Sequence, residues 1–281
     1  MFYLLNILIQ MKILLNNHTL HKTLRPFDDV GFVPTMGGIH EGHISLIRKS
    51  IKFSKKTLVS IFVNPKQFNN KKDFKFYPSN IKKDLAILKK NNKIDFIYIP
   101  KFKDIYKIKG NPEIKVDKKN KVLCAKYRKG HFEGVLDVMD RLTNLIKPKK
   151  IFMGKKDFQQ LFLVKRFIEK KYKTKVIGCK TIRNKNKLAL SSRNYLLSAS
   201  DLSEVEKISK NFFNLKKKIK NKDNINKFLQ KSKKKFENLF KIKIEYLENR
   251  SVKTLALSNK FLGSKIFLSY YFKDIRLIDN F

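Results

Sequence analysis

Short apolar runs alternate with longer amphipathic stretches through the first two thirds of the chain. Five of these runs end in turn-forming residues, as buried strands do. We predict the strands at 30–35, 57–64, 95–100, 150–154 and 174–182. Three intervening stretches repeat apolar residues at helical spacing. We predict helices there, at 40–54, 80–91 and 134–148. This alternation is typical of a parallel sheet with crossover helices.

The pattern changes after about residue 183. Two lysine-rich helical stretches fill 199–240. Three short apolar runs that resemble strands follow, at 243–250, 265–272 and 274–279. We therefore predict an α/β fold with two domains. A Rossmann-like parallel-sheet domain would occupy residues 1–182, and a second, smaller α/β domain would occupy residues 183–281.

The first 15 residues are apolar enough to be compared with a signal peptide. They have no basic start and no small-residue cleavage site, and the stretch is too short to span a bilayer. We predict an initial strand preceded by an extension, with Met11 as an alternative start. Cys124 and Cys179 have neither the spacing of metal ligands nor that of a disulfide framework. These features predict a cytoplasmic protein that does not associate with membranes.

The formal net charge is +42, from 65 basic and 23 acidic residues. Such a charge is compatible with binding to RNA, DNA or an anionic membrane. However, nine of the basic residues are arginine, and lysine is spread along almost the whole chain. Nucleic-acid sites favour clustered arginine, because its guanidinium makes bidentate and stacking contacts. We therefore favour compositional drift toward lysine, asparagine, isoleucine and phenylalanine, and we expect no specific nucleic-acid partner.

Four of the ten glycines and two of the five histidines lie between Gly31 and His43. The predicted strand ends here in a Thr-Met-Gly-Gly turn, and we expect the following helix to start near His40. His40 and His43 are spaced i,i+3, so they share one face of its first turn. Gly42 lets a ligand approach the backbone, and the N–H groups at a helix N-terminus attract anions. This arrangement suits the phosphates of a nucleotide and the charge that develops when one of them is attacked.

Two later segments carry complementary chemistry. Lys156 and Asp157 follow a predicted strand, and ligands bind at the carboxyl ends of strands in open parallel sheets. We expect the lysine to hold phosphate and the aspartate to accept hydrogen bonds from ribose hydroxyls. Ser191, Ser192 and Arg193 lie on a loop near the domain junction. Their hydroxyls and guanidinium would form a mobile clamp on a leaving pyrophosphate.

Together these segments resemble the pantothenate synthetase (pantoate–β-alanine ligase) family. This family belongs to a nucleotidyltransferase superfamily that shares an H-x-G-H signature with class I aminoacyl-tRNA synthetases. The resemblance rests on six segments that run in family order between residues 31 and 280. They are "VPTMGGIHEGHISLI", "SIFVNPKQFNNKKDFKFYP", "YRKGHFEGVLDVM", "FMGKKDFQQL", "LALSSRNYLLS" and "RLIDN".

The resemblance implies ATP-dependent condensation of (R)-pantoate with β-alanine to pantothenate, through pantoyl adenylate and with release of pyrophosphate and AMP. The catalytic residues that it implies are His40, as proton donor, with His43, Lys156 and Arg193. The ATP-binding residues that it implies are Met36, Gly37, Gly38, Ile39, His40, Glu41, Gly42, His43, Gly154, Lys155, Lys156, Asp157, Ile182, Leu190, Ser191, Ser192 and Arg193. The substrate-binding residues that it implies are Gln67 and Gln160, with Asn64, Tyr77, Arg128 and His131 as further contacts.

The sequence departs from the family pattern in two segments. Lys155 stands where the family usually has glutamate, and we expect this position to contribute mainly backbone to nucleotide binding. Lysines at 82–83 replace residues that are often acidic, which leaves Asp84 as the single candidate ligand for Mg²⁺. We therefore expect ATP phosphates to hold the metal chiefly. The resemblance also implies a homodimer.

Two other functions remain open on the sequence. One is a different H-x-G-H nucleotidyltransferase or a synthetase-like adenylating enzyme, although the paired glutamines would then be unexplained. The other is the polyanion-binding protein that the charge of +42 suggests. That protein would keep its RNA affinity at physiological salt, whereas a diffuse lysine surface should lose most of it.

Overall fold

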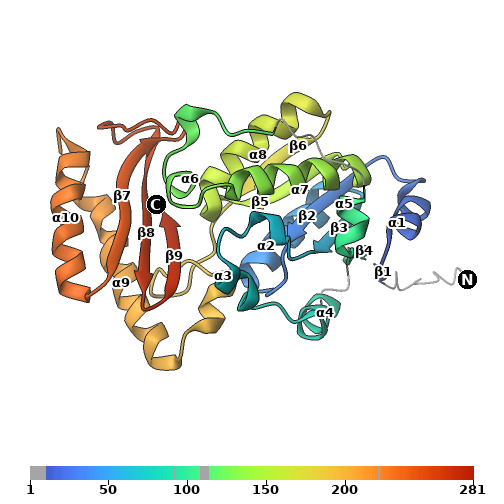
Figure 1. The fold of residues 1–281 in the computed structure, drawn as a ribbon, viewed down its shortest axis with the longest axis horizontal. Coiled ribbons are helices and arrows are strands. Elements are labelled where there is room, and N and C mark those ends of the chain that lie inside the picture. Colours follow the sequence, from blue (N-terminus) through green and yellow to red (C-terminus); the bar gives the residue numbers. More distant parts are fainter. Residues whose placement is uncertain (1–10, 91–92, 108–113, 221) are drawn as a thin grey trace, which may run out of the picture.

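The computed structural model describes residues 11–90, 93–107, 114–220 and 222–281. Two β-sheets lie side by side, each with its own helices, as Figure 1 shows. The described strands are β1 (Lys12–Leu14), β2 (Val30–Thr35), β3 (Lys56–Ile61), β4 (Phe96–Tyr98), β5 (Lys150–Gly154), β6 (Lys175–Cys179), β7 (Lys243–Ser251), β8 (Ser264–Phe272) and β9 (Ile275–Asn280).

The helices connect and cover these strands. The described α-helices are α1 (Asn17–Leu24), α2 (Glu41–Phe53), α3 (Lys71–Lys75), α4 (Ile81–Lys89), α5 (Phe102–Tyr106), α6 (Cys124–Tyr127), α7 (His131–Ile146), α8 (Phe158–Lys171), α9 (Ala199–Lys218) and α10 (Ile225–Phe240). Short 3₁₀ turns are η1 (Pro65–Gln67), η2 (Lys118–Asn120), η3 (Lys155–Asp157) and η4 (Ser192–Leu196).

The larger sheet is parallel, with the strand order β1-β4-β3-β2-β5-β6. Consecutive residues of its central strands enter different cores. Phe32 of β2 and Ile151 of β5 pack with α1, α7 and α8, whereas Val33 and Phe152 pack with α2 and α4. Side chains alternate between the two faces of a strand, so a sheet covered on both faces needs strands that are apolar throughout. This is why the predicted strands are continuous apolar runs.

A switch point in the strand order lies between β2 and β5. Strands β3 and β4 continue on one side of β2, whereas β5 and β6 lie on its other side. β2 pairs with β3 up to Thr35, but it pairs with β5 only at Gly31–Lys150 and Phe32–Ile151. The carboxyl ends of β2 and β5 are therefore not joined by a ladder. Crevices that bind ligands in open α/β sheets form at such switch points.

The smaller sheet is antiparallel, in the order β7-β8-β9, and it packs against α9 and α10. Its core includes Ile208 of α9 and Leu229 of α10, both fully buried. Tyr246 and Phe267 enter the core formed by α7 and α8 instead, so an apolar contact joins the two sheets. The division into domains at residues 182 and 183 stays a prediction.

The predicted α/β fold, with a parallel sheet and a smaller second sheet, is confirmed. The strand predicted at 57–64 was too long, because β3 ends at Ile61. Asn64 caps the following turn η1 through its side chain, and Pro65 occupies the first position of that turn. Proline has no N–H to continue a strand ladder, so the chain turns away from the sheet here.

Two other predicted strands were also too long. The run 95–100 forms only β4, which ends before Pro100. The run 174–182 forms only β6, an edge strand whose one neighbour among the described strands is β5. β6 ends at Cys179, which pairs with Gly154, the last residue of β5. An edge strand cannot continue beyond its partner, because it has no second ladder to join.

The helices predicted at 40–54, 80–91 and 134–148 are confirmed as α2, α4 and α7, although α7 begins earlier, at His131. The sequence pattern missed α1, the longer helix α8 and the shorter helices α3, α5 and α6. In α1, Asn16 caps the N-terminus, and only Leu20 and Leu24 are buried. Two buried positions in so short a segment give little periodic signal.

The end of the N-terminal apolar run, Lys12–Leu14, forms the edge strand β1, whose Ile13 lies opposite Ile97 of β4. Residues 1–10, and with them the predicted extension, lie outside the described residues. The alternative start at Met11 stays a prediction. In the described ranges, no helix combines the length and the apolar character needed to cross a membrane.

Candidate active site

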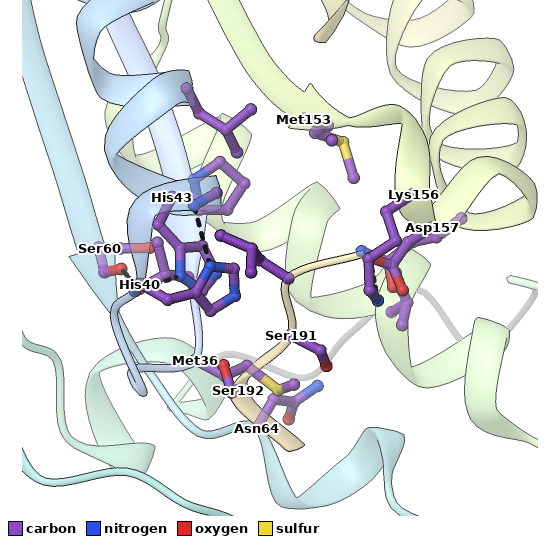
Figure 2. A pocket seen from close by; sticks show the side chains of 18 of the residues that line it. Met36, His40, His43, Ser60, Asn64, Met153, Lys156, Asp157, Ser191 and Ser192 are labelled. Carbon is purple, nitrogen blue, oxygen red and sulfur yellow. Dashed lines mark hydrogen bonds and ion pairs between the residues drawn. The ribbon is translucent and has the colours of Figure 1, made fainter. Parts of the chain in front are cut away.

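A cavity of about 220 Å³ lies where the ends of β2 and β5 separate. Figure 2 shows its two walls. His40 and His43 lie on one side, and Lys156 and Asp157 lie across the space from them. Ser191, from the loop that leads toward the smaller sheet, lies at one end. The cavity is therefore at the switch point of the sheet, where ligands bind in this class of fold.

The two histidines are fixed by backbone hydrogen bonds. His40 is the N-cap residue of α2, and its Nδ1 accepts a hydrogen bond from the N–H of Gly42 at 3.0 Å. The Nδ1 of His43 accepts one from the N–H of His40 at 3.4 Å. The rings lie with their centroids 4.1 Å apart. With Nδ1 accepting in both rings, the neutral imidazoles carry their proton on Nε2.

Both imidazoles are neutral at physiological pH. Burial, followed by the positive charge of Lys156, lowers the pKa of His40 to about 4. Burial, followed by the neighbouring His40, lowers the pKa of His43 to about 3. The two imidazoles can therefore offer N–H donors to phosphate oxygens while they are themselves uncharged.

The turn between β2 and α2 is held from both sides. Asp84 of α4 accepts hydrogen bonds from the N–H groups of Gly38 at 3.0 Å and Ile39 at 2.8 Å. The Ser192 hydroxyl donates to the Gly38 carbonyl at 2.9 Å, and the Tyr195 hydroxyl donates to the Ile39 carbonyl at 3.0 Å. Gly38 has a φ of +61°, and a Cβ there would collide with backbone. Glycine is therefore required at this position of the turn.

Asp84 does not line the cavity, because both of its oxygens bind the turn. Within the described part of the chain, no group of three or more His, Cys, Asp or Glu side chains could hold a metal ion. Mg²⁺ prefers six ligands in near-octahedral geometry, mostly oxygens. The described carboxylates do not form such a cage, and the geometry assigns Asp84 to the turn.

Lys156 and Asp157 lie in the turn η3 that follows β5, with Nζ and Oδ2 3.4 Å apart. Withdrawal from water favours a higher pKa for Asp157, but Lys156 and then Arg193 outweigh it and hold this pKa below its ordinary value. Asp157 is therefore an ionised hydrogen-bond acceptor. Lys155 is exposed and does not line the cavity, although its carbonyl accepts a hydrogen bond from Asn280 at 2.9 Å.

Two glutamines reach the cavity from different elements, Gln67 from η1 and Gln160 from α8. The side-chain N–H of buried Gln67 donates to the Met36 sulfur at 2.7 Å. Its carbonyl oxygen accepts from the Asn64 amide at 3.2 Å. Asn64 also donates to the Gly134 carbonyl of α7 at 3.2 Å. Neutral amides held in this way can recognise the hydroxyl groups of a small acid without adding charge.

The loop 190–193 connects the cavity with two other segments. Ser192 binds the turn at Gly38, as described above. The Arg193 Nη2 lies 3.0 and 2.9 Å from the two carboxylate oxygens of Asp73 in α3. The loop is thereby tied to the β2–α2 turn and to α3. Its predicted closure over pyrophosphate stays a prediction.

His131 and Arg128 line a second, smaller cavity that adjoins the main one. The His131 Nδ1–H donates to the Gln67 carbonyl at 2.6 Å, and its Nε2 accepts from the Arg128 guanidinium at 2.9 Å. Burial, followed by Arg128, lowers the pKa of His131 to about 3. His131 is therefore a neutral link between the backbone of Gln67 and the side chain of Arg128.

The main cavity brings together most of the residues predicted from the sequence. Those that line it are Met36, His40, Gly42, His43, Asn64, Gln67, Tyr77, Gly154, Lys156, Asp157, Gln160, Ile182, Leu190, Ser191, Ser192 and Arg193. Those outside its lining are Gly37, Gly38, Ile39, Glu41, Asp84, Arg128, His131 and Lys155. The first three form the turn, and Glu41 is exposed and pairs with Arg48.

Some lining residues were missed. Val138, Met139 and Leu142 of α7 line the cavity, and their helix also faces the core. A periodic apolar pattern cannot distinguish these two environments. Lys180 and Thr181 line the cavity directly after β6. Their position at the carboxyl end of a parallel strand was a signal that could have identified them.

Comparison of the sequence with known proteins identifies close relatives. The pantoate-beta-alanine ligase family model matches residues 10–281. A pantothenate synthetase from Flavobacterium psychrophilum is 37% identical over 268 residues, which cover 92% of this chain and 94% of that protein. A pantothenate synthetase from Endomicrobium trichonymphae is 36% identical over 277 residues, which cover 96% of this chain and 97% of that protein.

Solved structures agree with these relatives. A pantoate-beta-alanine ligase from Francisella tularensis, complexed with beta-gamma ATP and beta-alanine, matches with a TM-score of 0.81 and 35% identity over 96% of this chain and 97% of that chain. A pantothenate synthetase from Thermus thermophilus matches with a TM-score of 0.86 and 28% identity over 96% of this chain and 99% of that chain. The fold, the site and these matches along almost the whole sequence lead to one conclusion: the chain belongs to the pantoate–β-alanine ligase family.

Proposed function

We propose that this chain condenses (R)-pantoate with β-alanine in an ATP-dependent ligase reaction. The observation that carries the proposal is the lining of the main cavity. It combines His40, His43 and Lys156, which can bind phosphate, with the neutral amides of Gln67 and Gln160. Pantoate would first become pantoyl adenylate, and the amine of β-alanine would then form the amide of pantothenate. AMP and pyrophosphate are the other products.

In the first step, a pantoate carboxylate oxygen bonds to the α-phosphorus of ATP. The bond from that phosphorus to the oxygen bridging to the β-phosphorus breaks, and pyrophosphate leaves. A carboxylate is already a nucleophile, so this step needs alignment and charge stabilisation more than a general base. We assign the stabilisation to the Nε2–H groups of His40 and His43 and to the Lys156 ammonium, which line one cavity. Arg193 and the serines beside it would hold the leaving pyrophosphate.

His40 would therefore act as a hydrogen-bond donor in its neutral form. Its low pKa leaves little imidazolium at physiological pH, so a full proton donation is a poor match to this environment. The family resemblance implies a proton donor at this position. The present geometry supports the same contact with phosphate, with the proton remaining on Nε2.

In the second step, the amine nitrogen of β-alanine attacks the acyl carbon and the bond to the AMP oxygen breaks. The amine loses its proton to solvent. Gln67 and Gln160 would hold pantoate from two sides, with Asn64 orienting Gln67. Their uncharged amides recognise hydroxyl groups and leave the acyl carbon accessible to the amine.

Four further features belong to this proposal. Mg²⁺ would enter with ATP, held by its phosphates. Residues 1–182 would form the nucleotide- and pantoate-binding domain, and residues 183–281 would form a lid domain. The chain would work as a homodimer in the cytoplasm. It would act on small molecules and have no specific nucleic-acid partner.

Product analysis tests the reaction. The purified protein, supplied with ATP, Mg²⁺, pantoate and β-alanine, should form pantothenate and AMP in equal amounts, as followed by mass spectrometry. Omission of either pantoate or β-alanine should stop the amide from forming. ADP in place of AMP, or an amide formed equally well with other acids, would contradict the proposal and favour a different adenylating enzyme.

A further inference from the structure

Lys156 reaches the main cavity from the short turn η3, which connects β5 with α8. Its side chain is 16% exposed, and within the described ranges the one hydrogen-bond partner of its Nζ is the neighbouring Asp157, at 3.4 Å. A partner one residue away moves with the turn, so it cannot fix the ammonium relative to the rest of the site. The position of the Lys156 ammonium therefore depends on the backbone of η3.

The backbone of η3 is held by a side chain from the smaller sheet. Neither η3 nor α8, both fully described, has a side-chain hydrogen bond at its N-cap. Instead, the Nδ2 of Asn280 in β9 donates to the Lys155 carbonyl at 2.9 Å and to the Lys156 carbonyl at 2.7 Å. An amide nitrogen carries two hydrogens, so both of them bind consecutive carbonyls of the turn.

Asn280 is itself held by several contacts. It is 3% exposed, and its Oδ1 accepts a hydrogen bond from the Lys265 ammonium of β8 at 3.0 Å. Its backbone carbonyl accepts from the Arg183 guanidinium at 2.9 Å. Next to it, Ile266 and Phe281 exchange backbone hydrogen bonds at 3.0 and 3.1 Å, so the pairing of β8 and β9 extends past Asn280. The smaller sheet therefore fixes the amide that contacts η3.

The two halves of the molecule meet at this strand. β9 is the outer strand in the order β7-β8-β9, and in Figure 1 it lies on the side of the smaller sheet that faces the larger one. Arg183, which follows β6, binds the Asp279 carboxylate through both terminal nitrogens, at 2.6 and 2.7 Å. This ion pair ties the connection between the halves to β9, directly beside the amide of Asn280.

The hydrogen bonds explain why an asparagine suits this position. Two carbonyl oxygens of η3 accept from one nitrogen, while the oxygen of the same amide accepts from Lys265. A carboxylate of the same shape would place an oxygen against the two carbonyls. An apolar side chain would leave both carbonyls without this donor.

We propose that Asn280 is a positioning residue for the first half-reaction, because its amide holds η3 so that the Lys156 ammonium lies across the main cavity from the histidines. This inference rests on the proposed function, in which Lys156 stabilises charge on the phosphates. Asn280 also lines the second cavity, but both of its N–H groups are used on the turn. It acts through the backbone of η3, and a displacement of about 1 Å can slow a reaction about 100-fold.

Pantoate-dependent exchange of labelled pyrophosphate into ATP, with β-alanine omitted, measures this step. At saturating ATP and pantoate, Asn280→Ala and Asn280→Asp should exchange about 10- to 100-fold more slowly than the wild type. Asn280→Asp keeps the shape of the side chain and the oxygen that faces Lys265. A loss of rate in this variant therefore assigns the effect to the two missing donors.

Asn249→Ala is the matched control. Asn249 lies in β7 and is 1% exposed, and its Nδ2 donates to the Ser258 carbonyl at 2.8 Å and to the Lys260 carbonyl at 3.1 Å. It makes the same kind of contact as Asn280, but it lies outside the linings of the main and second cavities. Urea unfolding should show a comparable loss of stability for the two alanine variants, whereas exchange by Asn249→Ala should stay within about twofold of the wild type.

A double-mutant cycle shows whether Asn280 acts through Lys156. Lys156→Ala removes the ammonium, so in that background Asn280→Ala should slow exchange by less than about a further twofold. A substitution that only destabilises the fold would lower the rate by the same factor in both backgrounds. If exchange by Lys156→Ala is too slow to measure, the comparison of Asn280→Asp with Asn249→Ala decides.

The outcomes separate this inference from the proposed function. Wild-type exchange that does not require pantoate would overturn the proposed function itself. With pantoate-dependent exchange in the wild type, three results would overturn the inference alone. They are a rate within about twofold of the wild type in both Asn280 variants, an equal loss in Asn249→Ala, and equal factors with and without the Lys156 side chain.

Discussion

At the scale of single residues, histidine serves this site in its neutral form. His40, His43 and His131 all have a pKa lowered to between about 3 and about 4, with burial as the largest cause in each case. Their hydrogen bonds fit that form. His40 and His43 accept at Nδ1, and His131 donates at Nδ1 and accepts at Nε2.

This arrangement predicts a loss of stability on mild acidification. An unfolded histidine binds a proton near pH 6.5, whereas these folded ones do so only below about pH 4. The unfolded state therefore binds more protons between these values. The stabilisation is complete above pH 6.5 and is lost as the pH falls toward 4. Each such histidine should contribute about 1.4 kcal/mol per pH unit to the decline of the free energy of unfolding.

Urea unfolding between pH 4 and pH 8 measures this decline. His131→Gln keeps a donor and an acceptor but removes the titration, so its pH dependence should be shallower than that of the wild type. His18→Gln, which changes an exposed histidine of α1, is the control. Equal slopes for His131→Gln and the wild type would show that His131 is not a neutral buried group.

The sequence was sufficient to predict His40 and His43 from their spacing and the two glutamines from the family resemblance, and all four line the main cavity. It was not sufficient for the role of Asp84. The amides that Asp84 binds lie 45 and 46 residues before it in the chain. Asp73 is a similar case, because its partner Arg193 is 120 residues away. Contacts of this kind depend on tertiary packing and leave no local pattern.

At the scale of elements, the turn between β2 and α2 places the histidines. Asp84 accepts from its N–H groups, and the segment around Ser192 donates to its carbonyls. The turn therefore links α4 in the larger half of the molecule with the loop that leads to the smaller sheet. A change at Asp84 should act on the histidines through this turn.

Asp84→Ala should reduce both stability and activity. It leaves two N–H groups without their acceptor, which should lower the free energy of unfolding by about 2–4 kcal/mol. Pantoate-dependent exchange should fall at least about tenfold, because a displaced turn misplaces the histidines. The Mg²⁺ concentration that gives half-maximal activity should not change.

Chemical denaturation and a magnesium titration of the exchange reaction measure these effects. Asp28→Ala, which removes an exposed carboxylate paired with Lys55, is the matched control and should be nearly neutral. A large increase in the Mg²⁺ requirement of Asp84→Ala, with stability intact, would mean that this carboxylate binds the metal.

The elements of the larger sheet were predictable where a strand is buried on both faces. β2 and β5 have helices packed on both faces, so the sequence of each strand is almost entirely apolar and can be recognised as a buried strand. The gap between the ends of these strands was not predictable. It depends on a β2–β5 ladder that stops at Phe32 and Ile151, and no property of those two residues indicates it.

At the scale of the whole molecule, the charge of +42 opposes compaction and favours non-specific contact with polyanions. The basic groups of the proposed site are few and are placed by specific contacts, whereas the rest of the lysine is spread along the chain. We therefore expect the catalytic function to depend on the basic groups of the site and not on the net charge of the chain.

Added salt should weaken non-specific RNA binding and reduce the repulsion between lysines. RNA binding should weaken about 1,000-fold or more between about 50 mM and 200 mM salt, as expected for contacts with phosphates alone. The free energy of unfolding should rise over the same range, because salt screens the repulsion between lysines. Filter binding and urea unfolding measure the two effects. Tight RNA binding that persists above about 200 mM salt would support a dedicated polyanion-binding role.

The most direct test of the central claim is pantoate-dependent exchange of labelled pyrophosphate into ATP, with β-alanine omitted. The account predicts exchange only when pantoate is present, and a loss of about 100- to 1,000-fold in His40→Ala, as for removal of one preorganised donor to a developing charge. Exchange without pantoate, no exchange by folded protein at saturating ATP, or an undiminished rate in His40→Ala would contradict it.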